Sequence, residues 1–140
     1  MVGTPVAHSL SPALHGAAYA ALGLPWTYGR VELAPADLPG FLAGLGPEWA
    51  GLSLTMPLKQ TVLPLLDDVS ELAAATGVAN TMVLDGRGRH GDNTDVAGIV
   101  VALREAGVTR VQRAVVLGAG ATAVSALAAL GQLGEPAPLV

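Results

Sequence analysis

Cysteine is absent from the 140 residues, which excludes a disulfide framework and any thiolate metal site or nucleophile. Aromatic residues make up only 4% of the chain, so a core must be built from Ala, Leu and Val. Charged residues are scarce at 13%, and the net charge is −4. Phosphate binding needs clustered Lys and Arg, so this balance argues against a nucleic-acid partner. The histidines have no ligand spacing with carboxylates, and we expect no metal site.

Long hydrophobic runs are missing as well, although 51% of the residues are hydrophobic. No apolar run approaches the roughly 18 residues of a membrane span. The N-terminal segment MVGTPVAHSLSP lacks the charged and apolar regions of a signal peptide. The absence of cysteine fits a reducing compartment. These observations predict a soluble, cytoplasmic protein with no membrane partner.

Lysine occurs once, at position 59, in the segment LTMPLKQ (54–60). Pro57 predicts the start of a helix, because its fixed φ and missing N–H are tolerated in the first turn. Lys59 then falls at the positive end of the helix dipole, where a cation is mildly unfavourable. An unfavourable local choice without a structural gain marks a functional candidate. We therefore predict that Lys59 takes part in proton transfer.

Helical and strand patterns alternate along the chain, which is typical of an α/β fold with a mainly parallel sheet. The turn DGRG (85–88) predicts a hairpin between two of the strands. Residues 137–140 are expected to begin a further strand. The apolar periodicity predicts helices over residues 11–22, 35–45, 69–76, 94–106 and 121–132, and strands over 26–33, 50–55, 80–84, 90–92 and 113–117.

The segment VVLGAGATA (115–123) combines a predicted strand, a glycine turn and a predicted helix. Gly118 and Gly120 allow a tight turn and close approach of a phosphate, which the N–H groups of the helix start would bind. Ala123 stands at the third fingerprint position, an accepted variant. The alternative is a tight turn without a ligand. The residue that distinguishes NADP from NAD should lie about 20 residues further on, at or beyond the last residue given.

Both asparagines of the chain lie in two short polar segments, GVANT (77–81) and GDNTD (91–95). In GDNTD, Asn93 or Thr94 would cap a helix and Asp95 would suit its first turn. In GVANT, Asn80 would only stabilise a turn at a strand edge. The alternative is a functional site, in which Asp95 fixes the position of the Lys59 ammonium.

The remaining polar candidates have simple structural explanations. Ser9 and Ser11 precede Pro12 at a predicted helix start and are caps by default. His8 and His15 are expected to be structural, and His90 to be solvated in the hairpin.

The order of the motifs resembles that of the shikimate dehydrogenases. GTPVAHSLSPALH (3–15) is similar to the family's G-x-P-x-x-H-S-x-S-P-x-x-H, and GLSLTMPLK (51–59) to G-x-N-V-T-x-P-x-K. GVANT, GDNTD and GAGATA (118–123) are similar to G-A-V-N-T, G-x-N-T-D and G-A-G-G-A. The resemblance covers nearly the whole chain.

The resemblance implies a three-layer α/β domain over residues 1–105 that binds the substrate, followed by the start of a Rossmann NADP-binding domain over 106–140. The family reduces 3-dehydroshikimate to shikimate with NADPH in aromatic amino acid (chorismate) biosynthesis. By motif, Lys59 and Asp95 are the expected catalytic pair. The expected substrate contacts are Ser9, Ser11, Thr55, Lys59, Asn80 and Asp95, and the expected cofactor contacts are Gly118, Ala119, Gly120, Ala121 and Thr122.

The family runs to nearly twice this length, so we expect a truncated enzyme whose 140 residues alone are inactive. We also expect the apolar helix after Gly120 to be exposed, because an isolated strand–helix unit cannot cover both faces of its strand. Two alternatives remain: a quinate/shikimate dehydrogenase that uses NAD(P), and a non-catalytic substrate-binding fragment. The oligomeric state, monomer or homodimer, stays open.

Overall fold

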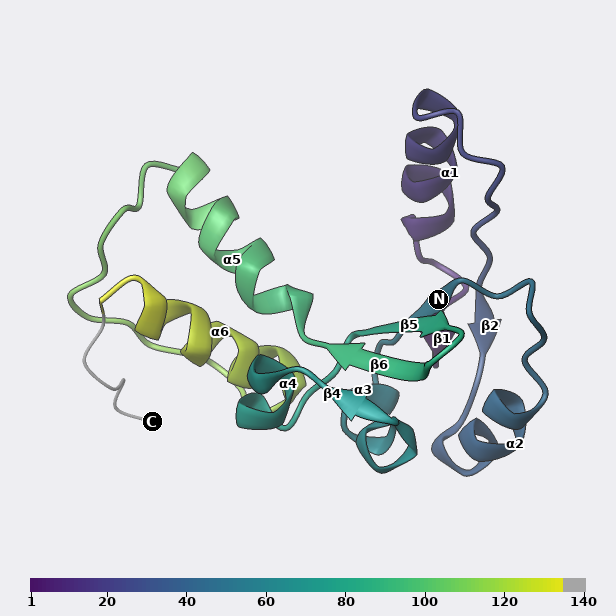
Figure 1. Cartoon of the computed structure of the whole chain (residues 1–140). Helices are drawn as coiled ribbons and strands as arrows, with labels where there is room; N and C mark the ends of the chain where they lie inside the picture. The colour runs from purple at the N-terminus through teal and green to yellow at the C-terminus, as the bar shows by residue number, and fades with distance from the viewer. Residues whose placement is uncertain (135–140) are drawn as a thin grey trace.

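The computed structural model describes residues 1–134, in which short strands and helices alternate (Figure 1). No helix in this range is long and apolar enough to cross a membrane. The strands are β1 (Val2–Gly3), β2 (Val31–Glu32), β3 (Gly51–Ser53), β4 (Asp68–Val69), β5 (Thr81–Asp85) and β6 (Gly88–Asp92). The helices are α1 (Ser11–Ala21), η1 (Pro35–Asp37), α2 (Leu38–Ala43), α3 (Leu58–Thr61), η2 (Leu63–Leu65), α4 (Glu71–Thr76), α5 (Thr94–Glu105) and α6 (Ala121–Gln132). The strand predicted over residues 137–140 lies outside the described residues.

The strands form two sheets that meet at one parallel bridge. β1 and β2 pair in parallel, and Val2 of β1 bridges Leu54, which follows β3. The second sheet has the order β3-β5-β6-β4, in which β5 is antiparallel to both neighbours and β4 is parallel to β6. The α/β class is confirmed. The second sheet is mixed because the predicted hairpin lies in its middle.

The strand directions bring several chain segments to one edge of the sheets. Ser53 at the end of β3 pairs with Thr81 at the start of β5, and Thr81 pairs with Asp92 at the end of β6. β1 runs parallel to the β3 segment and β4 runs parallel to β6, so both also end at this edge. Ligands of α/β proteins commonly bind beyond such strand ends. The pairing of Thr81 with Asp92 places the polar segments GVANT (77–81) and GDNTD (91–95) at this edge.

The core is built from aliphatic side chains, as the scarcity of aromatics predicted. Leu38 of α2, Leu58 of α3 and Met82 of β5 are almost completely buried in one cluster. The segment after Pro35 also faces this cluster, because Leu42 of α2 belongs to it and Phe41 packs against it. α3 is thereby anchored to the sheet through Leu58.

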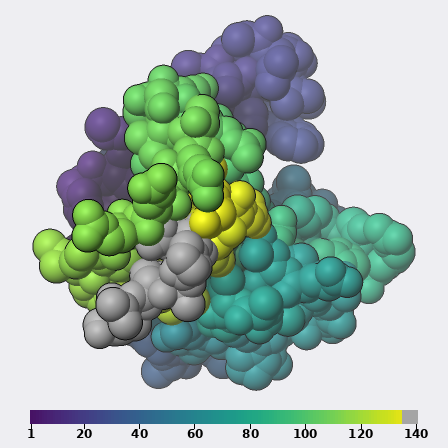
Figure 2. All heavy atoms as spheres, turned by 90° about the vertical axis from the view of Figure 1, so that its left-hand side faces the viewer, coloured from purple at the N-terminus to yellow at the C-terminus, as the bar shows by residue number. Residues whose placement is uncertain are grey.

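A smaller apolar cluster joins α5 and α6, which lie side by side (Figure 1). Figure 2 shows the end of α6, in yellow, between the green α5 and the teal segment that includes α4. We expected the helix after Gly120 to be exposed. This prediction is wrong for the face of α6 that packs against α5, because side chains of α5 cover it. The buried members of the cluster are Val96, Val100, Ala129 and Leu133.

Two predicted strands differ in the structure. Residues 113–117 form no strand, and the side chains of Val115 and Leu117 are 81% and 93% exposed. No other strand among residues 1–134 lies beside them, and a strand needs a partner for its backbone hydrogen bonds. Of residues 26–33, only Val31 and Glu32 pair, through β1. The apolar pattern alone did not predict which residues find a partner strand.

Candidate active site

Lys59 lies on α3, a helix of only four residues. Its carbonyl oxygen accepts a hydrogen bond from the Ala79 N–H at 2.8 Å, which ties this turn to the segment before β5. The predicted helix start near Pro57 is confirmed. The dipole argument for Lys59 is wrong, however, because a single turn has almost no macrodipole and Lys59 is near both of its ends. The position of Lys59 is set by Leu58 and by the contact with Ala79.

The ammonium of Lys59 forms an ion pair with Asp95, the second residue of α5. The distance between Lys59 Nζ and Asp95 Oδ2 is 2.5 Å, close enough for a direct charge-assisted hydrogen bond. The two side chains are 13% and 26% exposed, so the pair is partly desolvated. Such a pair holds a proton donor in a fixed place beside the strand ends.

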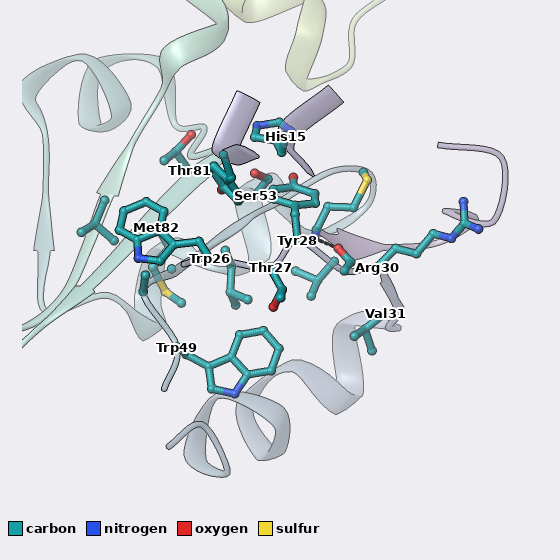
Figure 3. A pocket seen from close by; sticks show the side chains of 18 of the residues that line it. His15, Trp26, Thr27, Tyr28, Arg30, Val31, Trp49, Ser53, Thr81 and Met82 are labelled. Carbon is teal, nitrogen blue, oxygen red and sulfur yellow. Dashed lines mark hydrogen bonds between the residues drawn. The ribbon is translucent and has the colours of Figure 1, made fainter. Parts of the chain in front are cut away.

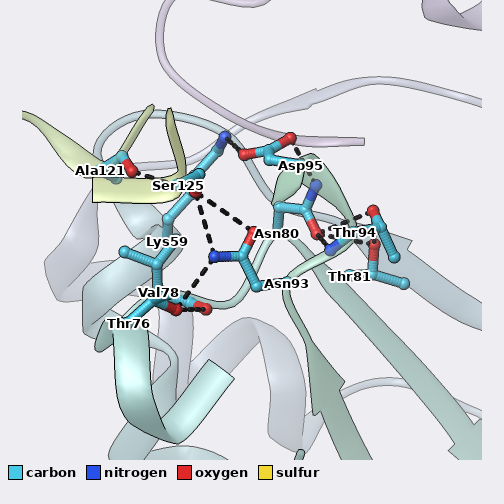
Figure 4. Close-up of polar contacts among 10 residues, drawn as sticks. All are labelled: Lys59, Thr76, Val78, Asn80, Thr81, Asn93, Thr94, Asp95, Ala121 and Ser125. Atoms are coloured by element: carbon cyan, nitrogen blue, oxygen red, sulfur yellow. Dashed lines mark hydrogen bonds and ion pairs between the residues drawn. The ribbon is translucent and has the colours of Figure 1, made fainter. Parts of the chain in front are cut away.

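Asn80 holds the other carboxylate oxygen of Asp95. Asn80 Nδ2 donates to Asp95 Oδ1 at 2.7 Å, and Asn80 Oδ1 accepts from the Thr94 N–H at 2.9 Å (Figure 4). A backbone N–H can only donate, so this second contact fixes which end of the amide faces the carboxylate. Asp95 is thus held at both oxygens, by Lys59 and by Asn80.

Two threonine hydroxyls complete this cluster, and the sequence patterns did not predict either. Thr81 Oγ1 and Thr94 Oγ1 each donate to Asn80 Oδ1 at 3.0 Å, and they lie 3.2 Å from each other. Both threonines follow an asparagine, at 80 and at 93, and the repeated Asn-Thr pair was the available signal. The explanation of Asn80 as turn chemistry alone is wrong, because its side chain bonds across the sheet edge.

Asn93 does not cap α5 with its side chain, contrary to one interpretation of GDNTD. It occupies the N-cap position without a side-chain cap hydrogen bond, and its amide points into the protein. Asn93 Nδ2 donates to Ser125 Oγ of α6 at 3.0 Å (Figure 4). The sequence contained no signal for this long-range contact.

Ser9 and Ser11 lie beside each other at the start of α1. Ser9 Oγ donates to Ser11 Oγ at 3.1 Å and accepts from the Ser11 N–H at 3.2 Å, so Ser9 does contribute to the helix start. Thr55 follows β3, and its N–H donates to the Val2 carbonyl at 3.0 Å. Within residues 1–134, no hydrogen bond joins these three side chains to the Lys59–Asp95 cluster, although all follow strands that end at the same edge.

The glycine turn before α6 has two features that suit an anion. Gly118 has φ +119°, a value that side-chain-bearing residues rarely adopt. α6 begins at Ala121 after Gly120, with no side-chain cap, so its first N–H groups are left for a ligand. α6 has 12 residues, enough for the dipole to favour an anion at its start. The turn therefore fits the pyrophosphate of a dinucleotide.

A separate hollow of about 730 Å³ is lined in part by residues of β3 and β5 (Figure 3). His15 stacks on Tyr28 in its wall, with ring centroids 4.1 Å apart, and the His15 ring also bonds to the Ser11 carbonyl. The Tyr28 hydroxyl is buried and has no hydrogen-bond partner among residues 1–134. Of the polar cluster around Asn80, only Thr81 reaches this wall. The hollow contains none of the predicted site residues.

The described part of the chain provides no ligand set for a metal centre. Residues 1–134 hold no group of three or more His, Asp or Glu side chains placed to bind one ion. His8 is exposed, and His90 lies in the hairpin between Asp68 and Asp85. The site therefore offers an ammonium, a carboxylate, amides and hydroxyls.

Comparison with known proteins gives matches to one enzyme family. The profile of the shikimate dehydrogenase substrate binding domain matches residues 1–82. The chain is 43% identical over its full length to the shikimate dehydrogenase (NADP(+)) of a Synechocystis strain, and it spans 49% of that protein. It is 44% identical over 96% of its length to the enzyme of the same name from Citrifermentans bemidjiense, of which it spans 47%. The chain thus spans about half the length of these curated relatives.

Solved structures show the same fold. Shikimate 5-dehydrogenase from Thermus thermophilus, in complex with shikimate, has a TM-score of 0.91 and 39% identity over 96% of this chain and 52% of that one. Shikimate dehydrogenase from Mycobacterium tuberculosis has a TM-score of 0.88 and 46% identity over 96% of this chain and 50% of that one.

Proposed function

We propose, since this chain belongs to the shikimate dehydrogenase family, that its strand-end cluster binds shikimate and 3-dehydroshikimate. The whole protein then interconverts these two compounds with NADP⁺ and NADPH, as a step of aromatic amino acid (chorismate) biosynthesis. We place it in the cytoplasm, as a monomer or homodimer.

The observation that carries this proposal is the Lys59–Asp95 ion pair with Asn80 behind it. An ammonium that is 13% exposed beside a sheet edge is a ready hydrogen-bond donor to an oxygen atom of a ligand. Amide and hydroxyl groups surround it at Asn80, Thr81 and Thr94. A polyhydroxylated acid needs such partners, because each buried hydroxyl left unpaired costs about 1–3 kcal/mol.

The two charged residues have different roles in the reduction. The reaction adds a hydride to the ketone carbon and a proton to the ketone oxygen, and NADPH supplies the hydride when it is bound. Lys59 donates its hydrogen bond, and then its proton, to the ketone oxygen. Asp95 holds the ammonium in position and accepts from a substrate hydroxyl. In the reverse direction the neutral amine of Lys59 takes the proton from the shikimate hydroxyl.

The remaining expected contacts divide between substrate and cofactor. Ser9, Ser11 and Thr55 lie after strands that end at the same edge, and we assign them to the carboxylate and hydroxyls of the substrate. Residues 118–122 hold the pyrophosphate of NADP through backbone N–H groups at the start of α6. We place the boundary between the substrate domain, 1–105, and the NADP-binding domain, from 106 onward, at the end of α5.

A calorimetric titration of the 140-residue chain with shikimate tests the proposal. We expect measurable binding by the wild type and at least ~10-fold weaker binding by Lys59→Met, which keeps the aliphatic stem and removes the ammonium. Gln60→Ala is the matched control, because Gln60 is the exposed neighbour of Lys59 on α3. Quinate in a parallel titration tests the alternative of a quinate/shikimate dehydrogenase. Absence of shikimate binding by the wild type would overturn the proposal.

A further inference from the structure

A buried amide and a buried hydroxyl meet between α5 and α6. Asn93 is 1% exposed and Ser125 is 0% exposed, and they are the two polar residues in the described range that are buried to this extent. Asn93 Nδ2 donates to Ser125 Oγ at 3.0 Å (Figure 4). The Ser125 hydroxyl proton has two acceptors in reach, the Ala121 carbonyl at 3.2 Å and Asn93 Oδ1 at 3.3 Å.

The orientation of the Asn93 amide follows from a third residue. Thr76 at the end of α4 donates its hydroxyl proton to the Leu72 carbonyl at 2.7 Å. Its oxygen therefore accepts from Asn93, whose Nδ2 lies at 3.0 Å. Both protons of the amide are thus used, one by Thr76 and one by Ser125. This one side chain connects α4, the loop before α5, and α6.

The Asn93–Ser125 hydrogen bond lies among apolar side chains. The side chains that pack α5 against α6 include Val96, Val100 and Ala129, all buried. Apolar contacts in such an interface tolerate small sliding movements, whereas a buried hydrogen bond is satisfied in only one arrangement. The Asn93–Ser125 contact therefore fixes how α6 lies against the start of α5.

Asn93 lies close in sequence to the proposed substrate cluster, and Ser125 lies close to the proposed nucleotide-binding turn. Asn93 is two residues before Asp95, which holds the Lys59 ammonium. Ser125 is on the second turn of α6, whose start follows the glycine turn at 118–120. The substrate cluster and the phosphate-binding turn are thus joined through one hydrogen-bonded pair.

We infer that Asn93 and Ser125 are positioning residues, which set the distance between the Lys59–Asp95 pair and the nucleotide-binding turn. This inference rests on the proposed function. Hydride transfer requires the donor and acceptor carbons to be aligned, and a displacement of about 1 Å can cost about 10²-fold in rate. Neither residue needs to touch the substrate or the cofactor for this role.

The first experiment measures amide hydrogen exchange in the 140-residue chain, without a cofactor. Shikimate at saturation should slow exchange in α6 from Val124 onward by at least ~3-fold in the wild type, because an ordered Asp95 segment orders Asn93 and through it Ser125. In Ser125→Ala this protection should disappear while shikimate affinity stays within about two-fold. Val100→Ala is the matched control, because it thins the same interface and leaves the hydrogen bond intact.

The second experiment measures turnover of shikimate with NADP⁺ in the active protein that carries this sequence. We expect Ser125→Ala to lower kcat about 10-fold with the KM for shikimate within about two-fold, and Ser125→Thr, which keeps the hydroxyl, to restore most of kcat. A purely structural role would lower thermal stability in Ser125→Ala and Val100→Ala alike and leave kcat unchanged.

The outcomes separate this inference from the proposed function. A wild type that does not bind shikimate would remove both. Shikimate binding by the wild type with unchanged exchange in α6, or equal losses of kcat in Ser125→Ala and Val100→Ala, would overturn only the positioning role.

Discussion

Lys59 Nζ and Asp95 Oδ2 lie 2.5 Å apart although 36 positions separate the two residues in the sequence. The contact joins the turn after β3 to the first turn of α5, so it forms only in the folded chain. Exposed ion pairs contribute about 0–1 kcal/mol to stability. This pair is less exposed and is held by Asn80 as well, so removal of either partner leaves a partly desolvated charge without its counter-ion.

Removal of the ammonium should affect turnover more than stability. We expect Lys59→Ala to lower kcat for shikimate oxidation by at least ~10²-fold, since general acid–base catalysis contributes about 10²–10⁴-fold. Steady-state kinetics with NADP⁺ checks this, with Gln60→Ala as the control at the exposed neighbouring position. A kcat within a few-fold of the wild type would mean that Lys59 is structural.

Replacement of the carboxylate by an amide should mainly weaken substrate binding. Asp95→Asn keeps the shape but loses the charge that fixes the Lys59 ammonium, and Asn80 Nδ2 would then face an amide instead of a carboxylate. We expect shikimate to bind at least ~10-fold more weakly, as measured by calorimetry. An unchanged dissociation constant would show that Asp95 does not position the ammonium for the ligand.

Much of the site could be predicted because local motifs carry it. The single lysine marked Lys59, the family resemblance of GVANT and GDNTD assigned Asn80 and Asp95, and the structure brings these three side chains together. The reason first given for Lys59 was wrong, because α3 is a single turn without a useful dipole. Rarity in the sequence was the better signal.

The contacts that were missed all depend on partners distant in the sequence. Asn93 or Thr94 was expected to cap α5, yet the Asn93 amide is buried against Ser125, 32 positions away. Residues 113–117 have the apolar run of a buried strand but have no partner strand among residues 1–134. Periodicity reports which side of a segment is apolar, whereas pairing depends on what the rest of the chain places beside it.

His90 should titrate above its ordinary pKa of 6.5. The hydrogen bond to Asp85 raises the pKa of His90 most, and the hydrogen bond to Asp68 adds to it, while Arg87 opposes it. Hydrogen bonds from Arg87 in turn lower the pKa of Asp85 to about 2, so this carboxylate stays charged. An NMR titration of the His90 ring checks the direction, and Asp85→Asn should return the pKa toward 6.5.

The sign of the pH effect on stability follows from this shift. A folded-state pKa above the unfolded value means that the protonated imidazole stabilises the fold. The contribution is fully present below pH 6.5 and is lost as the pH rises through the folded-state pKa. The loss of thermal stability in Asp85→Asn relative to the wild type should be larger on the acidic side of this range, because the contacts of Asp85 with Arg87 are lost at every pH in the range and those with protonated His90 only at low pH. An equal pH dependence of thermal stability in the two proteins would contradict a stabilising role of protonated His90.

Two glycines provide a matched test of how the strand end supports the site. Gly3 has φ +151°, and a Cβ there would meet the Thr55 side chain and, at 2.7 Å, the carbonyl oxygen of Met56. Both neighbours belong to the turn that leads to Lys59. Gly16, within α1, has nothing within 4 Å of the corresponding position.

We expect Gly3→Ala to lower stability by about 2–3 kcal/mol, since such backbone strain costs about 1–3 kcal/mol and the overlap adds to it. Gly16→Ala should instead raise stability by about 0.5–1 kcal/mol, because alanine is the better helix former. Urea unfolding measures both values. Shikimate titration of the two variants should then show weaker binding only in Gly3→Ala, because only this change displaces the turn that carries Thr55 and leads to Lys59. Equal stability of the two variants would mean that the close approach of β1 to this turn does not constrain the site.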